Sequence, residues 1–122
     1  MNLFSWLLVG HLVGDWVLQN EYMANGKRLY AFGLACLLHC VFYTITLLVS
    51  VWLAGSAQND STRYLLAAVI LFGSHWLIDG WNLAEKWGRW FGQTPVTFVR
   101  VMTDQTMHVC VLVVLAEVIT RY

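Results

Sequence analysis

The sequence predicts an all-α protein, a bundle of four membrane-spanning helices that run antiparallel, up and down. Hydrophobic residues make up 59% of the 122 residues and charged residues only 11%, whereas soluble domains are roughly half apolar and a quarter charged. The apolar residues also form segments near twenty residues long, about the length that crosses a bilayer. Four such spans and their turns use the whole chain, so residues 1–122 are predicted to form a single transmembrane domain.

The four spans are expected at about residues 3–19, 30–53, 64–82 and 98–119. A short turn that contains Asn25-Gly26, a dipeptide typical of turns, separates the first span from the second. A polar loop over residues 54–63 separates the second span from the third. Short connections of this kind join antiparallel neighbours, so the predicted bundle runs up and down.

Residues 81–93, between the third and fourth spans, differ in character from the spans. Aromatic and basic side chains recur there at helical spacing: Trp87, Trp90 and Phe91, with Lys86 and Arg89. This mixture is typical of a short amphipathic segment that lies at the headgroup level of a membrane. Thr94 and Pro95 are then expected as the N-cap and the first helical position of the last span.

The basic residues predict how the bundle is oriented. Five of the seven lie between the first and second spans or near the junction of the third and fourth: Lys27, Arg28, Lys86, Arg89 and Arg100. Because basic loops face the cytoplasm, both termini are expected in the periplasm, in a multi-pass protein of the bacterial inner membrane. The net charge of zero provides no basic footprint for nucleic acid. The expected partner is the lipid membrane, with a homo-oligomer or a larger membrane assembly as further candidates.

The ionisable residues inside the spans follow a pattern. All four histidines lie in apolar spans, and three of them have an aspartate four positions away, which on a helix is one turn along the same face. The three pairs are His11 with Asp15, His75 with Asp79, and Asp104 with His108. His39 stands alone in the second span.

The order of histidine and aspartate along each span predicts that the three pairs meet inside the bundle. The first and third spans run toward the cytoplasm with histidine before aspartate, and the fourth, which runs the other way, has aspartate first. At about 1.5 Å per residue, the aspartates are expected in one layer about 6 Å from the cytoplasmic edge, and the histidines in a second layer about 6 Å deeper. A charged aspartate at a helix centre costs about 2.5–3.5 kcal/mol on insertion scales, so these side chains are expected to face inward and to pair.

Several kinds of site would satisfy such a cluster. Imidazole and carboxylate groups on facing helices hold transition metals, so one hypothesis is a site for one or two divalent ions of zinc, manganese or iron. Its predicted ligands are His11, Asp15, His39, His75, Asp79, Asp104 and His108. Alternatively, the pairs form hydrogen bonds between helices without a ligand, or a proton or ion path. A haem between two histidines is a further alternative, which three aspartates suit poorly.

Other side chains near the cluster have weaker cases. Cys36 and Cys40 flank His39 on its helix and can add sulfur ligands, although small buried thiols are ordinary packing residues. Tyr43, one turn beyond His39, either donates a hydrogen bond to a substrate or simply packs. Three amides are expected near the cytoplasmic mouth: Gln19, Asn82 and Gln105.

Four stretches together resemble a known family. They are His11-Leu-Val-Gly-Asp15-Trp-Val-Leu-Gln19 with Tyr22-Met23-Ala24 and Lys27, then Leu38-His39 with Tyr43, then Ser74-His75-Trp-Leu-Ile-Asp79, and finally Asp104-Gln105-Thr-Met-His108. In this order they are similar to small membrane proteins of bacteria and phages that share a domain of unknown function, number 3307. The resemblance implies a multi-pass inner-membrane protein but no established activity. The His/Asp layout is also distantly similar to membrane-bound proteins assigned as metal-dependent hydrolases.

These residues lead to one functional hypothesis and a rival. The hypothesis is an intramembrane metal-binding protein that acts as a metal-dependent hydrolase on lipid headgroups or phosphate esters at the cytoplasmic leaflet. A bound ion would lower the pKa of a water molecule, and Asp15, in the shallower layer near Gln19, would be the catalytic base. The rival is a non-catalytic membrane subunit or a phage-encoded envelope factor, whose His/Asp cluster is structural or forms the proton or ion path.

Overall fold

The computed structural model describes residues 1–57, 60–93 and 95–121. Within these residues the regular structure is helical throughout, with no strand, so the all-α prediction is confirmed. In chain order the elements are α1 Leu3–Leu12, the π-helical turn η1 Val13–Val17, α2 Glu21–Gly26, α3 Leu34–Leu53, α4 Ser61–Gly80, α5 Leu83–Trp90 and α6 Thr97–Arg121.

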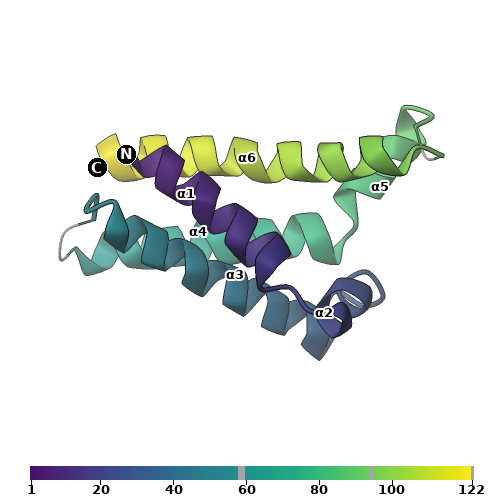
Figure 1. Ribbon diagram of the computed structural model, residues 1–122, viewed down its shortest axis with the longest axis horizontal. Helices are drawn as coiled ribbons and strands as arrows, with labels where there is room; N and C mark the ends of the chain where they lie inside the picture. The colour runs from purple at the N-terminus through teal and green to yellow at the C-terminus, as the bar shows by residue number, and fades with distance from the viewer. Residues whose placement is uncertain (58–59, 94, 122) are drawn as a thin grey trace.

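The four longer helices pack in an up-and-down arrangement. α1 contacts α3 and α6, and α4 contacts the same two helices. Figure 1 shows that successive long helices run in opposite directions and that both termini lie at one end of the bundle. The short helices α2 and α5 lie at the opposite end, so that end is covered by connections longer than simple turns.

Among the described residues, three helices are long and apolar enough to cross a membrane: α3, α4 and α6. The first predicted span, residues 3–19, is instead a shorter apolar helix, Leu3–Val17. Its ten α-helical and five π-helical residues reach about 22 Å, less than the ~30 Å hydrocarbon core of a bilayer. The predicted four full spans are therefore corrected to three candidate spans and one shorter apolar helix.

Local polar groups decide where the helices begin. The side chain of Asn20 accepts a hydrogen bond from the Met23 backbone N–H at 2.9 Å and starts α2, which is why the first helix cannot continue through residue 19. Asp60 accepts from the backbone N–H groups of Thr62 and Arg63 and starts α4.

The segment between the third and fourth predicted spans contains the expected short helix. α5 carries its charged and apolar side chains on different faces, as residues 81–93 predict, and its depth in a membrane stays a prediction. The predicted N-cap Thr94 lies outside the described residues. Pro95 precedes the helix, because α6 begins at Thr97 rather than at the predicted first position.

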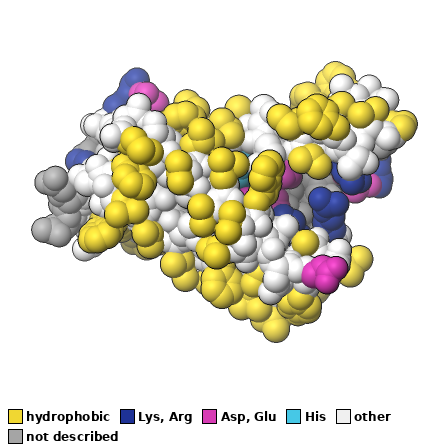
Figure 2. Space-filling view, in the orientation of Figure 1, with side chains coloured by type: hydrophobic (Ala, Val, Ile, Leu, Met, Phe, Trp, Pro, Cys, Tyr) yellow, Lys and Arg dark blue, Asp and Glu magenta, His cyan; other side chains and the backbone are white. Residues whose placement is uncertain are grey.

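The half of the bundle near the termini has an apolar core. Leu7, Leu47, Leu112 and Leu115 are fully buried in it. α1 and α3 approach closely here, since a Cβ atom added at Gly10 would clash with the Ser50 hydroxyl oxygen. Hydrophobic side chains also cover much of the outer surface of this half (Figure 2), which suits a surface in contact with lipid.

Candidate metal centre

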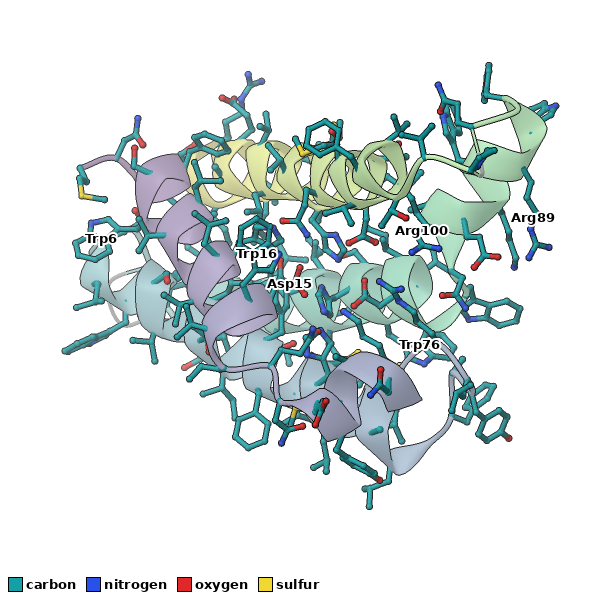
Figure 3. The ribbon with its side chains drawn as sticks, turned by 45° about the vertical axis from the view of Figure 1, so that its right-hand side comes forward. Trp6, Asp15, Trp16, Trp76, Arg89 and Arg100 are labelled. Atoms are coloured by element: carbon teal, nitrogen blue, oxygen red, sulfur yellow. The ribbon has the colours of Figure 1, made fainter. Side chains whose placement is uncertain are left out.

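Buried polar side chains fill the other half of the bundle, between the same four helices. Asp15 comes from η1, His39 from α3, His75 and Asp79 from α4, and His108 from α6. Each of them is at most 4% exposed. Figure 3 shows Asp15 among the polar side chains that lie between the helices. Buried groups of this kind must be satisfied by partners, so their mutual distances decide what the cluster can hold.

The first group of potential ligands is Asp15, His39, His75 and Asp79. Nε2 of His39 lies 3.2 Å from Oδ1 of Asp15, 3.3 Å from Oδ2 of Asp79 and 2.9 Å from Nε2 of His75. Nε2 of His75 lies 3.4 Å from Oδ2 of Asp79 and 3.9 Å from Oδ1 of Asp15. Ligand atoms about 2.0–2.1 Å from a tetrahedral ion are about 3.3–3.4 Å apart, so these four atoms have nearly the spacing that such an ion needs.

The second group is Asp79, Asp104 and His108. Nδ1 of His108 is 2.9 Å from the backbone oxygen of Asp104, and because a carbonyl oxygen only accepts, Nδ1–H donates this bond. In the neutral ring Nε2 then carries a lone pair. This buried Nε2 has no hydrogen-bond partner among the described residues and lies 3.4 Å from Oδ1 of Asp79. A ring held through Nδ1–H with a free Nε2 is the arrangement typical of a metal-ligating histidine.

Asp79 belongs to both groups. Its Oδ2 faces His39 and His75, and its Oδ1 faces His108. A carboxylate with one oxygen toward each of two ligand sets can bridge two ions. The Asp79 carboxylate thus contacts the rings of all three of these histidines, so aspartate and histidine side chains meet at one place rather than in separate layers.

His11 belongs to neither ligand group. Its Nε2 is 2.9 Å from the amide oxygen of Gln105, to which it donates, and its Nδ1 is 3.0 Å from the Tyr43 hydroxyl. Gln105 in turn donates from Nε2 to Oδ2 of Asp15 at 2.8 Å. The predicted His11–Asp15 pair is therefore joined through Gln105 rather than by direct contact. The π-helical turn Val13–Val17 changes the residue spacing per turn and shifts Asp15 relative to His11.

Lys27 is the main participant that the sequence analysis missed. Its side chain is only 8% exposed, and Nζ lies 2.5 Å from Oδ2 of Asp79, 3.7 Å from Oδ1 of Asp15 and 3.4 Å from Nε2 of His39. Burial lowers the pKa of Lys27, but the carboxylates of Asp79 and Asp15 outweigh it and raise the pKa above its usual value. The side chain is therefore a cation at neutral pH.

No local pattern distinguishes Lys27 from its neighbour Arg28, and the sequence alone indicates only one of several basic residues in a turn predicted to be cytoplasmic. Its position among the stretches that resemble the family was the one available signal. Cys36 and Cys40 are buried, as expected of packing residues, and neither belongs to the two ligand groups.

A cavity of about 170 Å³ opens next to the cluster. The three amide side chains expected at the mouth line it: Gln19, Asn82 and Gln105. Asp15, Asp79 and Asp104 also line it, together with Lys27, Arg28 and Arg100. Figure 2 shows basic and acidic side chains gathered in the recess at this end of the molecule. The candidate ligands are thus reachable from the end of the bundle that carries α2 and α5.

The fold and this cluster define an all-α protein with a buried His/Asp centre that can hold metal ions. The family model described as "Protein of unknown function (DUF3307)" matches residues 3–122, and the chain belongs to this family. No curated protein and no solved structure matches the chain.

Proposed function

We propose that this chain is a membrane protein that binds one or two divalent metal ions and hydrolyses phosphate esters, including those of lipid headgroups. The observation that carries the proposal is the state of His108. Its Nδ1–H is held by the Asp104 carbonyl, and its buried Nε2 has no hydrogen-bond partner among the described residues. An unpaired buried nitrogen costs about 1–3 kcal/mol, which a metal ion would offset.

Each of the two ligand groups would hold one ion. One ion would be held by Asp15, His39, His75 and Asp79, and a second by Asp79, Asp104 and His108. Nitrogen and oxygen donors suit zinc, manganese and iron alike. When bound, such an ion lowers the pKa of a coordinated water to about 7 and so supplies hydroxide at neutral pH.

Asp15 is the proposed catalytic base. Asp15 is itself a member of the first ligand group. Its Oδ1 lies 3.2 Å from Nε2 of His39, while its Oδ2 accepts the hydrogen bond from Gln105 and the side chain lines the cavity. Asp15 would take a proton from the attacking water as the water oxygen bonds to phosphorus. The P–O bond to the alcohol then breaks, and the proton passes from Asp15 to the departing oxygen.

The cavity lining supports an anionic substrate. Arg28 and Arg100 lie on its wall, outside the ligand groups. Guanidinium groups bind phosphate oxygens through charge-assisted hydrogen bonds and can do so bidentately. A phosphate held there would lie beside the carboxylates that hold the ions.

The rival function is a non-catalytic membrane subunit, or a phage-encoded envelope factor, whose cluster is structural or conducts protons. One observation favours it: Lys27 already supplies a positive charge against Asp79 and Asp15. In this reading the ammonium group takes the place of a metal ion, and the helices are joined by buried ion pairs.

Elemental analysis of the purified protein in detergent separates the two functions. We expect one or two tightly bound ions per chain, retained through dialysis, and a thermal midpoint that falls when a chelator removes them. A chain that carries no ion, and whose midpoint does not respond to added zinc or manganese, would support the structural role.

The catalytic role of Asp15 is tested by Asp15→Asn, which keeps the shape and removes the base. We expect this variant to fold and to retain some metal, with hydrolysis of a chromogenic nitrophenyl phosphate reduced by about 10²–10⁴. Asp15→Leu is the matched control, because it also removes the hydrogen-bond acceptor for Gln105. If Asp15→Asn has full activity and only Asp15→Leu fails, Asp15 is structural.

A further inference from the structure

Three adjoining cavities follow the seam between α5 and the start of α6. The polar cavity beside the candidate metal centre shares Arg100 with a second cavity of about 290 Å³. That second cavity shares Val99 and Thr103 with an open apolar groove of about 660 Å³. Ile78 of α4 lines both the polar cavity and the groove. The metal centre and the groove are therefore neighbours.

The groove follows one face of α6. Phe98, Met102, Thr106 and Cys110 line it at intervals of four residues, and Trp87 of α5 lines it as well. The stripe from Phe98 to Cys110 is about 18 Å long at 1.5 Å per residue, close to the ~15 Å thickness of the hydrocarbon in one leaflet. An apolar groove of this length fits a single acyl chain.

The three cavities together form a path from the candidate metal centre to the groove. The polar cavity at one end of this path is lined by cations that lie outside the ligand groups. Nε of Arg100 is buried and has no hydrogen-bond partner among the described residues, and the amide oxygen of Gln19 in the same cavity is also without one. Arg28 lies on the same wall. Figure 3 shows Arg100 near the junction of α5 and α6, the end from which the groove starts.

The charges of this cavity set a condition on anion binding. Its lining includes four carboxylates, those of Asp15, Asp79, Glu85 and Asp104, against the three cations Lys27, Arg28 and Arg100. Bound metal ions would offset the aspartates. An anion is therefore expected to bind on the arginine side of the cavity, and more tightly when metal is present.

We propose that the molecule binds one phosphate-bearing lipid along this path, with the phosphate on Arg100 and Arg28 and one acyl chain in the groove on α6. An occupant with an anionic part and an apolar part joined over a short distance matches both ends of the path. The proposal rests on the proposed function for the reaction that follows, but not for binding itself.

Native mass spectrometry of the full chain in detergent tests the binding, with three probes: dioleoyl phosphatidate, dioleoylglycerol and inorganic phosphate. The first two have the same acyl chains, and only the first carries a phosphate. We expect phosphatidate to be retained at least about tenfold better than dioleoylglycerol, as charge-assisted hydrogen bonds predict. Inorganic phosphate at equal concentration should not displace it, because it lacks the chain.

Two pairs of variants locate the lipid. Arg100→Gln should reduce the preference for phosphatidate over dioleoylglycerol, because Arg28 alone then holds the phosphate, whereas Arg121→Gln, at the far exposed end of α6, should not. Thr106→Trp should fill the groove and weaken both lipids at least about fivefold, as loss of apolar contact predicts. Thr120→Trp is its control, since both threonines are exposed on α6 and donate to the carbonyl four residues earlier.

Equal retention of the two lipids, or an Arg100→Gln chain whose preference for phosphatidate is undiminished, would overturn the phosphate site. Displacement of phosphatidate by inorganic phosphate at equal concentration would show that the site takes free phosphate. It would contradict the proposal that an acyl chain binds in the groove. The metal content of the same samples is measured alongside. Lipid binding without any ion contradicts only the hydrolase proposal, and bound metal without lipid preference contradicts only this inference.

Discussion

The two halves of the bundle are made from the same four long helices but are held together differently. Near the termini, leucine, isoleucine and valine side chains are buried against one another. At the other end ionisable side chains are buried as well, and Lys27 is the only lysine or arginine among those that the structure describes as buried. It opposes three carboxylates that line one cavity: Asp15, Asp79 and Asp104.

The difference shows what each half depends on. Apolar burial is non-directional and needs no ligand, so the half near the termini is complete by itself. Buried carboxylates are costly unless they are paired, and one ammonium group does not match the two buried ones, Asp15 and Asp79, together with the half-buried Asp104. The polar half is therefore the part of the molecule whose stability should respond to metal ions.

The largest effect is expected from Asp79→Leu. It removes the carboxylate shared by both ligand groups and leaves Lys27 without its nearest partner, at a cost of about 3–5 kcal/mol for the broken buried pair. We expect loss of all bound metal together with reduced stability. Leu112→Ala, in the apolar half, should cost about 2–5 kcal/mol and leave the metal content unchanged. Full metal content in Asp79→Leu would contradict the conclusion that the polar half binds the metal.

His75→Ala and His11→Ala test which histidines of the polar half bind metal. Both histidines are fully buried, but only His75 lies in a ligand group. We therefore expect His75→Ala to lose metal and to have a lower thermal midpoint. His11→Ala should lower the midpoint, because Tyr43 and Gln105 lose a partner, yet retain metal. Elemental analysis of both variants decides the matter, and the opposite pattern would place His11 among the ligands.

Lys27→Met tests whether the Lys27 ammonium group competes with a metal ion for the carboxylates of Asp79 and Asp15. Without metal the variant should lose stability, since two buried carboxylates lose their cation. With zinc or manganese it should recover, and its metal affinity should rise at least about tenfold, because a neighbouring positive charge has been removed. Titration calorimetry measures the affinity. A weaker affinity than in the unaltered chain would mean that Lys27 assists the metal site rather than competes with it.

The substitutions expected to affect the protein least are those that test its orientation in the membrane. The polar half is predicted to face the cytoplasm, so a cysteine at Gln93 should be protected from a membrane-impermeant thiol reagent in intact cells. A cysteine at Ser61, at the other end and also exposed, should react. Both substitutions are made with Cys110 replaced by Ser, because Cys110 is exposed too. The reverse labelling pattern would invert the predicted topology without affecting the comparison of the halves.

Much of the fold follows from the sequence, because helices form from contacts between residues close along the chain. Apolar length predicts α3, α4 and α6, and Asp60 marks the start of α4 by bonding to the backbone of the next residues. The meeting of His39, His75, Asp79 and His108 was also predictable, since charges in apolar helices have to turn toward one another. The first helix was predicted too long, because its end depends on the start of α2.

Only the tertiary structure decided which of these groups touch. Lys27 reaches Asp79 across 52 residues of sequence and Gln105 reaches His11 across 94, and no local pattern encodes such contacts. Which histidines belong to the candidate ligand groups, and the position of the groove beside the candidate metal centre, depend on how the helices pack. The burial of Lys27, which lies outside the apolar helices, was likewise decided by packing. The sequence by itself determined that the four histidines, Asp15 and Asp79 are buried, because burial follows from the apolar segments that carry them. Their partners are set by distances between helices, which exist only in the packed bundle.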